Sequence, residues 1–237
     1  METDILHGSD EWKAERYDRI TGTDVAKILG LDSECSRMKL MRMKFTKEEP
    51  VVSAYGEKLM RLGREFEPVA REAYLEWDPD CQGRVPGLFQ AKEPWLVGSP
   101  DMIDQGKKLV VEFKCHFHPS IIHSRPYESC EKIPLKHYVQ VQTYMYILGW
   151  ERGRLFSWTP CNGFSIFEFR FDQRLWDKIM PEVKIFEDQM TNLKRVGLES
   201  RHGQQILSWM KFPREYKQEW INKVWFSLLD NTTEIKQ

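Results

Sequence analysis

The segment SPDMIDQGKKLVVEFK, residues 99–114, decides the fold class of this chain. From Lys108 to Cys115 the side chains alternate, with one face formed by Leu109, Val111, Phe113 and Cys115. This period of two predicts a β-strand. Asp104–Lys107 predicts a turn in which Gly106 can adopt a positive φ. Residues 95–103 are then expected to form the partner strand of a hairpin, which would bring Asp101 close to Glu112.

Asp101, Glu112 and Lys114 are residue types that suit metal-dependent hydrolysis. Mg²⁺ prefers hard oxygen ligands and commonly takes one or two carboxylates together with water and substrate phosphate. Such an ion stabilises charge on a phosphodiester and makes a nucleophile from bound water. A lysine beside the carboxylates can orient or deprotonate that water. The alternative is a surface ion pair between strands, which contributes less than about 1 kcal/mol.

Two predicted helices carry further polar residues. Residues 55–77 have apolar residues at helical spacing, with Glu67 on the predicted buried face. A buried carboxylate is costly unless it is paired or bound to a metal; alternatively, Glu67 lies at the edge of the apolar stripe and reaches solvent. Gly63 costs roughly 1 kcal/mol within a helix, which predicts close approach by another segment. In the second helix, about residues 135–148, Gln140 and Tyr144 lie one turn apart on one face.

The N-terminal region contains WKAER at residues 12–16 and ITGT at residues 20–23. Thr21 or Thr23 can cap a helix that runs from about Asp24 to Gly30. A helix N-terminus with an arginine nearby suits a phosphate group, because free backbone N–H groups point at it. Helix capping alone is the alternative interpretation of the two threonines.

In this order, the segments resemble the lambda-exonuclease and YqaJ-type viral recombinase family of the PD-(D/E)XK nuclease superfamily. The resemblance covers about residues 10–150 and rests on five motifs, which are Trp12–Arg16 with Ile20–Thr23, Gly63–Glu67, Ser99-Pro100-Asp101, Glu112-Phe113-Lys114-Cys115 and Gln140-Val141-Gln142. It implies a catalytic site whose metal ligands are Asp101, Glu112, Glu67 and the backbone carbonyl of Phe113. Lys114 and Gln140 would lie beside the attacking water, and Gln140 rather than Gln142 takes this role. Arg16, Thr23 and Ser99 would bind the 5′-phosphate of a DNA end; the family often has Ser at the position of Thr23.

The expected architecture is α/β, with a PD-(D/E)XK (restriction-endonuclease-like) core in which helices flank a central mixed β-sheet. We expect a single nuclease domain over residues 1–237, with a helical part at about 1–80, the catalytic sheet and helices at about 83–190 and a helical tail at about 205–230. The resemblance implies a Mg²⁺-dependent deoxyribonuclease with two ions, for which Mn²⁺ can substitute. It would digest the 5′-ended strand of linear double-stranded DNA and leave 3′ overhangs for recombination. A single-strand annealing protein is the partner it implies, and a ring-shaped trimer the assembly.

Three other functions fit the same residues. An endonuclease of the same superfamily, of the restriction or resolvase kind, would use the same site. A host-shutoff ribonuclease is known among viral relatives. A nuclease-derived DNA-binding module without turnover is the alternative from another class, but the intact set of Asp101, Glu112 and Lys114 argues against it.

Composition indicates an ordinary soluble domain. The 237 residues are 41% hydrophobic and 30% charged, enough for one domain with a real core. No apolar stretch approaches the ~20 residues that span a bilayer, and the acidic start Met1-Glu2-Thr3-Asp4 lacks a signal-peptide core. We therefore expect a soluble intracellular protein without membrane association, in the host cytoplasm or nucleus if the source is viral.

The net charge of −1 is unusual for a protein that binds nucleic acid. A cluster of metal-binding carboxylates lowers the total, however, and the distribution of charge matters more than its sum. Residues 194–223 contain seven Lys or Arg and three Glu. This stretch is either a DNA contact or a solvated helical face.

The five cysteines are widely spaced and form no C-x-x-C pair, so they indicate neither a structural zinc site nor a disulfide framework, and they argue against a four-cysteine iron–sulfur cluster. Cys115 is expected in the core. Cys115-His116-Phe117-His118 could supply zinc ligands, or its polar residues could face DNA.

The C-terminal third has strand-like runs at Gly153–Thr159 and Phe164–Phe171 and a helix pattern over Arg174–Met190. In the tail, apolar residues recur every four positions, at Phe212, Tyr216, Trp220, Val224 and Leu228. Such an aromatic stripe belongs either to the core or to a subunit interface, where Trp and Tyr are enriched.

Overall fold

The computed structural model describes residues 1–6, 8–48, 51–211 and 213–235. The helices are α1 (Asp10–Asp18), α2 (Gly22–Ile28), α3 (Arg37–Thr46), α4 (Ala54–Trp77), α5 (Leu135–Leu148), α6 (Gln173–Val196), α7 (Arg201–Trp209) and α8 (Arg214–Asn231), with 3₁₀ turns at Ile121–His123 and Cys130–Lys132. The strands are β1 (Ile20–Thr21), β2 (Gly83–Arg84), β3 (Phe89–Gln90), β4 (Leu96–Gly98), β5 (Met102–Asp104), β6 (Leu109–Cys115), β7 (Arg152–Trp158), β8 (Phe164–Arg170) and β9 (Thr232–Ile235).

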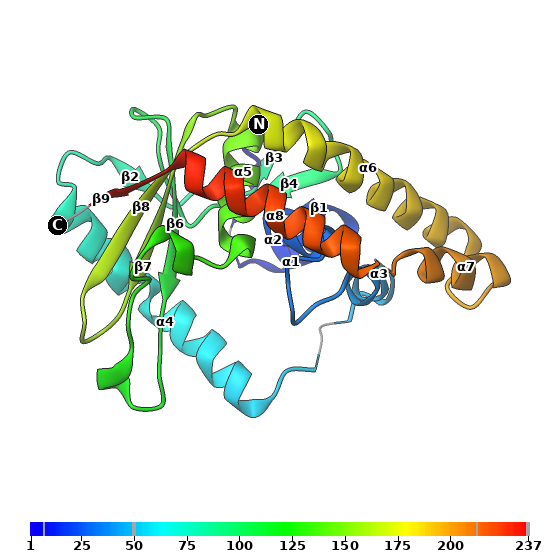
Figure 1. Cartoon of the computed structure of the whole chain (residues 1–237), viewed down its shortest axis with the longest axis horizontal. Helices are drawn as coiled ribbons and strands as arrows, with labels where there is room; N and C mark the ends of the chain where they lie inside the picture. Colours follow the sequence, from blue (N-terminus) through cyan, green and yellow to red (C-terminus); the bar gives the residue numbers. More distant parts are fainter. Residues whose placement is uncertain (7, 49–50, 212, 236–237) are drawn as a thin grey trace.

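The centre of the molecule is a mixed sheet of six strands in the order β2-β5-β6-β7-β8-β9 (Figure 1). Strands β6 and β7 are parallel, and the other neighbours are antiparallel. A small second sheet has the order β1-β4-β3. The predicted central mixed sheet flanked by helices is confirmed.

The alternation in β6 divides its apolar side chains between two cores. Leu109 and Val111 pack in a cluster with Ala70 and other residues of α4. Val110 points to the opposite face and belongs to the larger cluster, which includes Tyr138 of α5. The sheet therefore has α4 on one face and α5 on the other, and both helices carry predicted site residues.

The hairpin predicted before β6 forms, but its first arm is not the single strand that the sequence predicts. Residues 95–103 form two short strands, β4 in the small sheet and β5 beside β6, instead of one. Pro100 lies between them, and its missing N–H group interrupts a ladder. The turn also differs, because Lys108, with φ 48°, adopts the left-handed conformation that the sequence predicts for Gly106. The Asp104 carboxylate accepts a hydrogen bond from the Lys107 N–H (2.9 Å), which fixes this turn from within.

Helix α4 has the predicted bounds but is buried only in its C-terminal half. Ala70 and Tyr74 are fully buried, whereas Met60 and Val69 are exposed. A Cβ atom added to Gly63 would meet nothing within 4 Å, so the predicted close approach of another segment there is wrong. The apolar stripe of the N-terminal half lies beyond the part of the helix that packs on the sheet.

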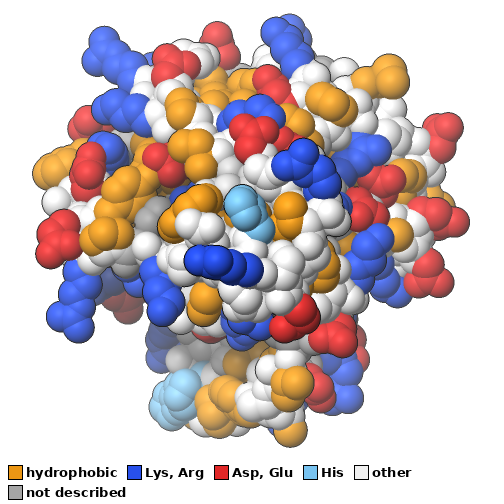
Figure 2. Space-filling model, turned by 90° about the vertical axis from the view of Figure 1, so that its right-hand side faces the viewer, with side chains coloured by type: hydrophobic (Ala, Val, Ile, Leu, Met, Phe, Trp, Pro, Cys, Tyr) orange, Lys and Arg blue, Asp and Glu red, His pale blue; other side chains and the backbone are white. Residues whose placement is uncertain are grey.

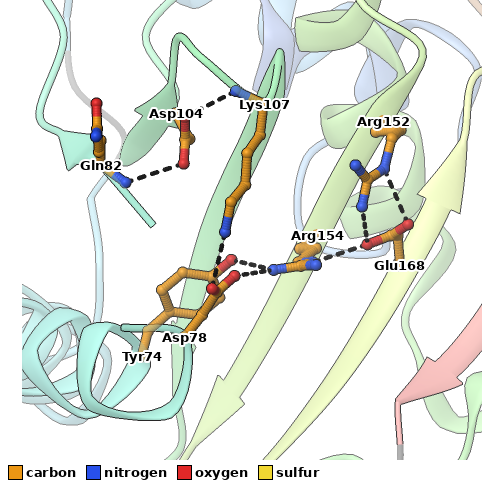
Figure 3. Close-up of polar contacts among 8 residues, drawn as sticks. All are labelled: Tyr74, Asp78, Gln82, Asp104, Lys107, Arg152, Arg154 and Glu168. Atoms are coloured by element: carbon orange, nitrogen blue, oxygen red, sulfur yellow. Dashed lines mark hydrogen bonds and ion pairs between the residues drawn. The ribbon is translucent and has the colours of Figure 1, made fainter. Parts of the chain in front are cut away.

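A polar network fastens the end of α4 to the sheet (Figure 3). The guanidinium of Arg154, on β7, donates to the Tyr74 hydroxyl (2.7 Å), Asp78 Oδ2 (2.8 Å) and Glu168 Oε2 (2.8 Å). Lys107 Nζ donates to the other oxygen of Asp78 (2.8 Å). These contacts fix the C-terminal end of the helix that carries Glu67.

Replacing Arg154 with methionine is expected to lower the free energy of unfolding by about 2–4 kcal/mol, because it removes the charge-assisted bonds to Asp78 and Glu168 and the donor to the buried Tyr74 hydroxyl. Asp78 keeps its contact with Lys107, and Glu168 keeps its contact with Arg152. Arg154 is 8% exposed. Arg152→Met is the matched control, since Arg152 also binds Glu168 but its side chain is 44% exposed; we expect it to cost less than about 1 kcal/mol. Urea unfolding measures both values, and equal losses would contradict a special role of Arg154.

The C-terminal part completes the larger core. Trp220, Val224 and Leu228 on α8 are buried within the chain, which assigns the tail stripe to the core; Phe212 lies outside the described residues. Helix α6 is longer than predicted. Helix α7 and the edge strand β9 are present although the sequence does not predict them as separate elements.

Two of the seven Lys and Arg residues in the stretch 194–223 form ion pairs with acidic side chains of the described residues. Lys194 pairs with Asp18 and Lys223 with Glu219. On the face where α7 lies, basic and acidic side chains are interspersed (Figure 2). This pattern favours a solvated surface over a DNA contact.

None of the described helices combines the length and the apolar composition needed to cross a membrane.

Candidate active site

Glu112 lies at the centre of the candidate site and is only 2% exposed. Its Oε1 accepts hydrogen bonds from Lys114 Nζ (2.6 Å) and from Gln140 Nε2 (2.6 Å). Lys114 reaches Glu112 because it lies two residues along the same strand face, and Gln140 reaches it from α5, which covers that face. Gln142 instead donates to the carbonyl of Arg170 and accepts from the N–H of Asp172, so it holds the backbone.

Asp101 lies at the bend between β4 and β5, where its carboxylate reaches across to β6. Asp101 Oδ2 accepts a hydrogen bond from the Phe113 N–H (2.8 Å), so Asp101 contacts the residue that follows Glu112. Glu67, from α4, pairs with Arg71 (3.1 Å), and its side chain is 26% exposed. Glu67 is therefore neither fully buried nor in bulk solvent.

The three carboxylates lie close enough to repel one another. Burial and the negative charge of Asp101 raise the pKa of Glu67 to about 7, against the opposing effect of Arg71. Burial and the same charge raise the pKa of Glu112 to about 8. Burial alone would lower the pKa of Lys114, but Glu112 and Asp101 raise it above its usual value. The site thus concentrates negative charge where little water can screen it.

One oxygen of Glu112 has no partner in the described part of the chain. Oε2 is buried and accepts no hydrogen bond, which is costly for a carboxylate oxygen. A divalent cation would satisfy it, and the oxygen donors of Asp101, Glu112 and the Phe113 carbonyl suit Mg²⁺. Within the described residues, however, no three acidic, histidine or cysteine side chains are already gathered around a common ion position. Glu67 would have to exchange its contact with Arg71 to become a ligand.

A pocket beside these residues contains the three positions predicted to bind phosphate. Arg16, Thr23 and Ser99 all line it, together with Tyr144. The Arg16 guanidinium lies over the ring of Trp12, 4.4 Å from its centroid. The Thr23 hydroxyl lies 3.0 Å from that of Thr21, which precedes the first residue of α2. Thr21 is the N-cap residue of α2. The helix begins at Gly22, two residues before the predicted start.

Tyr144 joins the pocket to the carboxylate site. Its hydroxyl accepts a hydrogen bond from Gln140 Nε2 (3.0 Å), which also binds Glu112. Its ring fills the space beside Gly22 and Gly98, where an added Cβ would approach the ring to 2.4 Å and 2.8 Å. The sequence shows Tyr144 on the face of Gln140, but the two glycines that admit its ring lie far away in the chain.

The histidines after β6 do not form a zinc site. His116 Nε2 is hydrogen-bonded to Ser157 Oγ (2.9 Å), and its ring contacts that of Tyr127. His118 is exposed, and Cys115 is partly buried beside the smaller core. Within the described residues, no three metal-binding side chains lie in one place here, so the zinc interpretation is not supported.

His116 is expected to lower the stability as the pH falls from about 6.5 to 4, because it is neutral in the folded protein. The raised pKa values of Glu67 and Glu112 act in the opposite direction, so the contribution of His116 is measured as the difference between wild type and variant. Burial and the charge of Lys114 lower the pKa of His116 to about 4, from an ordinary value of 6.5. The unfolded chain therefore binds a proton in this window that the folded chain does not, which destabilises the fold by about 1–3 kcal/mol. His116→Gln should reduce this loss in urea titrations, whereas the exposed His118→Gln serves as the control. An unchanged slope in His116→Gln would contradict the assignment.

Comparison with known proteins agrees with this geometry. The family model of the YqaJ-like viral recombinase domain matches residues 11–151. The crystal structure of an alkaline exonuclease (LHK-Exo) from Laribacter hongkongensis is similar with a TM-score of 0.60 and 21% identity, over 79% of this chain and 97% of that chain. A phage related exonuclease from Haemophilus somnus 129PT is similar with a TM-score of 0.53 and 14% identity, over 73% and 95%. The comparison with curated proteins gave no match.

The fold is the PD-(D/E)XK architecture, which the chain shares with these solved exonuclease structures. Because the match to the family model covers more than half of the sequence, the chain belongs to the YqaJ-like viral recombinase domain family. The family resemblance expected from the motifs is thereby confirmed.

Proposed function

We propose that this protein is a Mg²⁺-dependent 5′→3′ exodeoxyribonuclease that acts on linear double-stranded DNA and leaves 3′ single-stranded overhangs. One observation carries the proposal: Glu112 is buried, with one oxygen bound by Lys114 and Gln140 and the other without a partner among the described residues. Such an arrangement is costly for folding alone. It suits a site that is completed when a cation binds.

Asp101, Glu112, Glu67 and the Phe113 carbonyl would hold two Mg²⁺ ions, for which Mn²⁺ would substitute. Bound metal would stabilise the negative charge on the phosphodiester and lower the pKa of a coordinated water. Lys114 Nζ, which donates to Glu112, would orient the attacking water. Hydrolysis adds that water to phosphorus and breaks the bond to the bridging oxygen, which takes up a proton. Gln140 fixes Glu112 from the helix side.

The preference for a 5′ end would come from the neighbouring pocket. Arg16 supplies a guanidinium, which binds phosphate through several N–H groups, and Thr23 and Ser99 supply hydroxyls. Tyr144 lines this pocket and contacts Gln140, so a phosphate bound there would lie next to the carboxylates. This proximity supports the recognition of a terminal phosphate close to the bond that is cut.

Other activities and partners remain proposals by family resemblance. The same site could serve an endonuclease, a host-shutoff ribonuclease or a DNA-binding module without turnover. A single-strand annealing protein and assembly into a ring-shaped trimer would fit a role in recombination. The intact set of Asp101, Glu112 and Lys114 favours an active nuclease.

Purified protein is expected to release nucleotides from linear duplex DNA only when Mg²⁺ or Mn²⁺ is present, and faster from 5′-phosphorylated than from 5′-hydroxyl ends. Covalently closed circular DNA and RNA should remain intact. End-labelled duplexes, a closed circle and an RNA of the same sequence, each with and without metal, test this directly. Cutting of the circle would instead indicate an endonuclease, degradation of RNA alone a ribonuclease, and binding without any release a non-catalytic module.

A further inference from the structure

A buried lysine outside the catalytic residues holds two parts of the phosphate pocket together. Lys44, on α3, is 4% exposed. Its ammonium group donates to Asp24 Oδ2 (2.7 Å), to the carbonyl of Arg19 (2.7 Å) and to the carbonyl of Arg16. Three partners match the three donors of an ammonium group, which is how a buried lysine is made tolerable.

These partners lie on both sides of the pocket. The Arg16 and Arg19 carbonyls are at the C-terminal end of α1, the helix from which the Arg16 side chain extends. Asp24 lies in α2, and its Oδ2 also accepts from the N–H (3.0 Å) and the hydroxyl (2.7 Å) of Thr21. Lys44 therefore links the end of α1 to the first turn of α2, where Thr23 lies.

The charges are divided so that Arg16 is left for a ligand. Asp24 pairs with Lys44 through Oδ2 and with Lys27 through Oδ1 (3.3 Å), so the Lys44 ammonium is bound within the fold and is not presented to the pocket. Arg16, by contrast, forms no ion pair with any carboxylate of the described residues, and its guanidinium lies against the Trp12 ring. Lys44 thus has a structural position, whereas Arg16 lines the pocket without a carboxylate bound to it within the described residues.

We propose that Lys44 is a positioning residue that sets the separation of Arg16 and Thr23, and thereby the preference of the enzyme for 5′-phosphorylated ends. The proposal rests on the phosphate-binding role given above to Arg16, Thr23 and Ser99. Small displacements of a substrate-positioning group weaken recognition strongly. Replacement of Lys44 should therefore lower kcat/KM for the 5′-phosphorylated duplex far more than for the 5′-hydroxyl duplex.

The test compares kcat and KM on 5′-phosphorylated and 5′-hydroxyl linear duplexes. Lys44→Met is expected to raise KM for the phosphorylated duplex and to reduce the ratio of the two kcat/KM values about tenfold, with kcat changed little. Lys47→Met is the matched control, because Lys47 also joins α3 to α1 through Asp18 (2.8 Å) but is exposed. In Lys47→Met, the ratio of the kcat/KM values for the two duplexes should equal that of the wild type. Arg16→Gln removes the pocket's cation directly and should abolish the preference.

In Lys44→Met, the buried Asp24 keeps Lys27 and Thr21 as partners but loses its closest cation, which destabilises the fold. The double variant Asp24→Asn/Lys44→Met, which removes both charges, is therefore measured as well. It is expected to show the same reduced ratio. If Arg16→Gln loses the preference while both Lys44 variants keep the wild-type ratio, or if they slow both duplexes equally, the proposal for Lys44 is wrong and the phosphate pocket stands. If the wild type does not distinguish the two ends, the proposed 5′-end recognition itself fails.

Discussion

Replacing Glu112 with glutamine is expected to reduce the rate of Mg²⁺-dependent DNA cleavage at least about 10³-fold, which corresponds to roughly 4 kcal/mol of transition-state stabilisation. Glutamine keeps the shape of the side chain and an oxygen for Lys114 and Gln140. It removes the negative charge that would hold the metal. The buried Oε2, which has no partner among the described residues, becomes an amide nitrogen or oxygen that binds a cation poorly.

A second measurement separates metal binding from catalysis. Mg²⁺ that binds only the folded state raises the melting temperature, by an amount that follows its affinity. The wild type should show this shift and Glu112→Gln should lose it, while the metal-free variant melts no lower than the metal-free wild type. Glu65→Gln is the control, because Glu65 is an exposed residue of α4 that pairs with Arg61. Full activity of Glu112→Gln, or an unchanged Mg²⁺ shift, would contradict the proposed site.

The parts of the site that local sequence could predict are those fixed within one element. Alternation in β6 places Glu112 and Lys114 on one face whatever the rest of the chain does, because successive strand residues point to opposite sides. The helical spacing that predicts α5 likewise holds over its whole length. The spacing of apolar residues predicts a helix or strand reliably where one face of that element is buried along its whole length.

The parts that local sequence could not predict depend on contacts between distant elements. The sequence predicts Glu67 on a buried face, but its side chain is 26% exposed, and Arg71 binds its carboxylate. The left-handed residue of the β5–β6 turn is Lys108 rather than Gly106, because Asp104 bonds the turn internally. No local pattern marks Lys44, whose partners are set by the packing of α3 against α1 and α2.

Replacing Lys114 with methionine is expected to reduce kcat about 10²–10³-fold, the range typical of a group that handles the attacking water or its proton. Methionine retains most of the buried aliphatic chain and removes the ammonium, which lies 2.6 Å from Glu112 Oε1. In contrast to Glu112→Gln, the metal-induced rise in melting temperature should persist, because both carboxylates nearest the site remain and Glu112 loses a competing cation. Lys114→Arg should not restore the rate, since a planar guanidinium cannot occupy the position of a compact ammonium.

Single-turnover cleavage at saturating Mg²⁺, followed alongside the Mg²⁺-dependent melting shift, distinguishes the roles of the two residues. Loss of cleavage with a retained shift places Lys114 at the water. Loss of both would show instead that Lys114 builds the metal site by holding Glu112 in place. Cleavage at the wild-type rate would remove Lys114 from the reaction altogether and leave Gln140, the other donor to Glu112, as the candidate for orienting the attacking water.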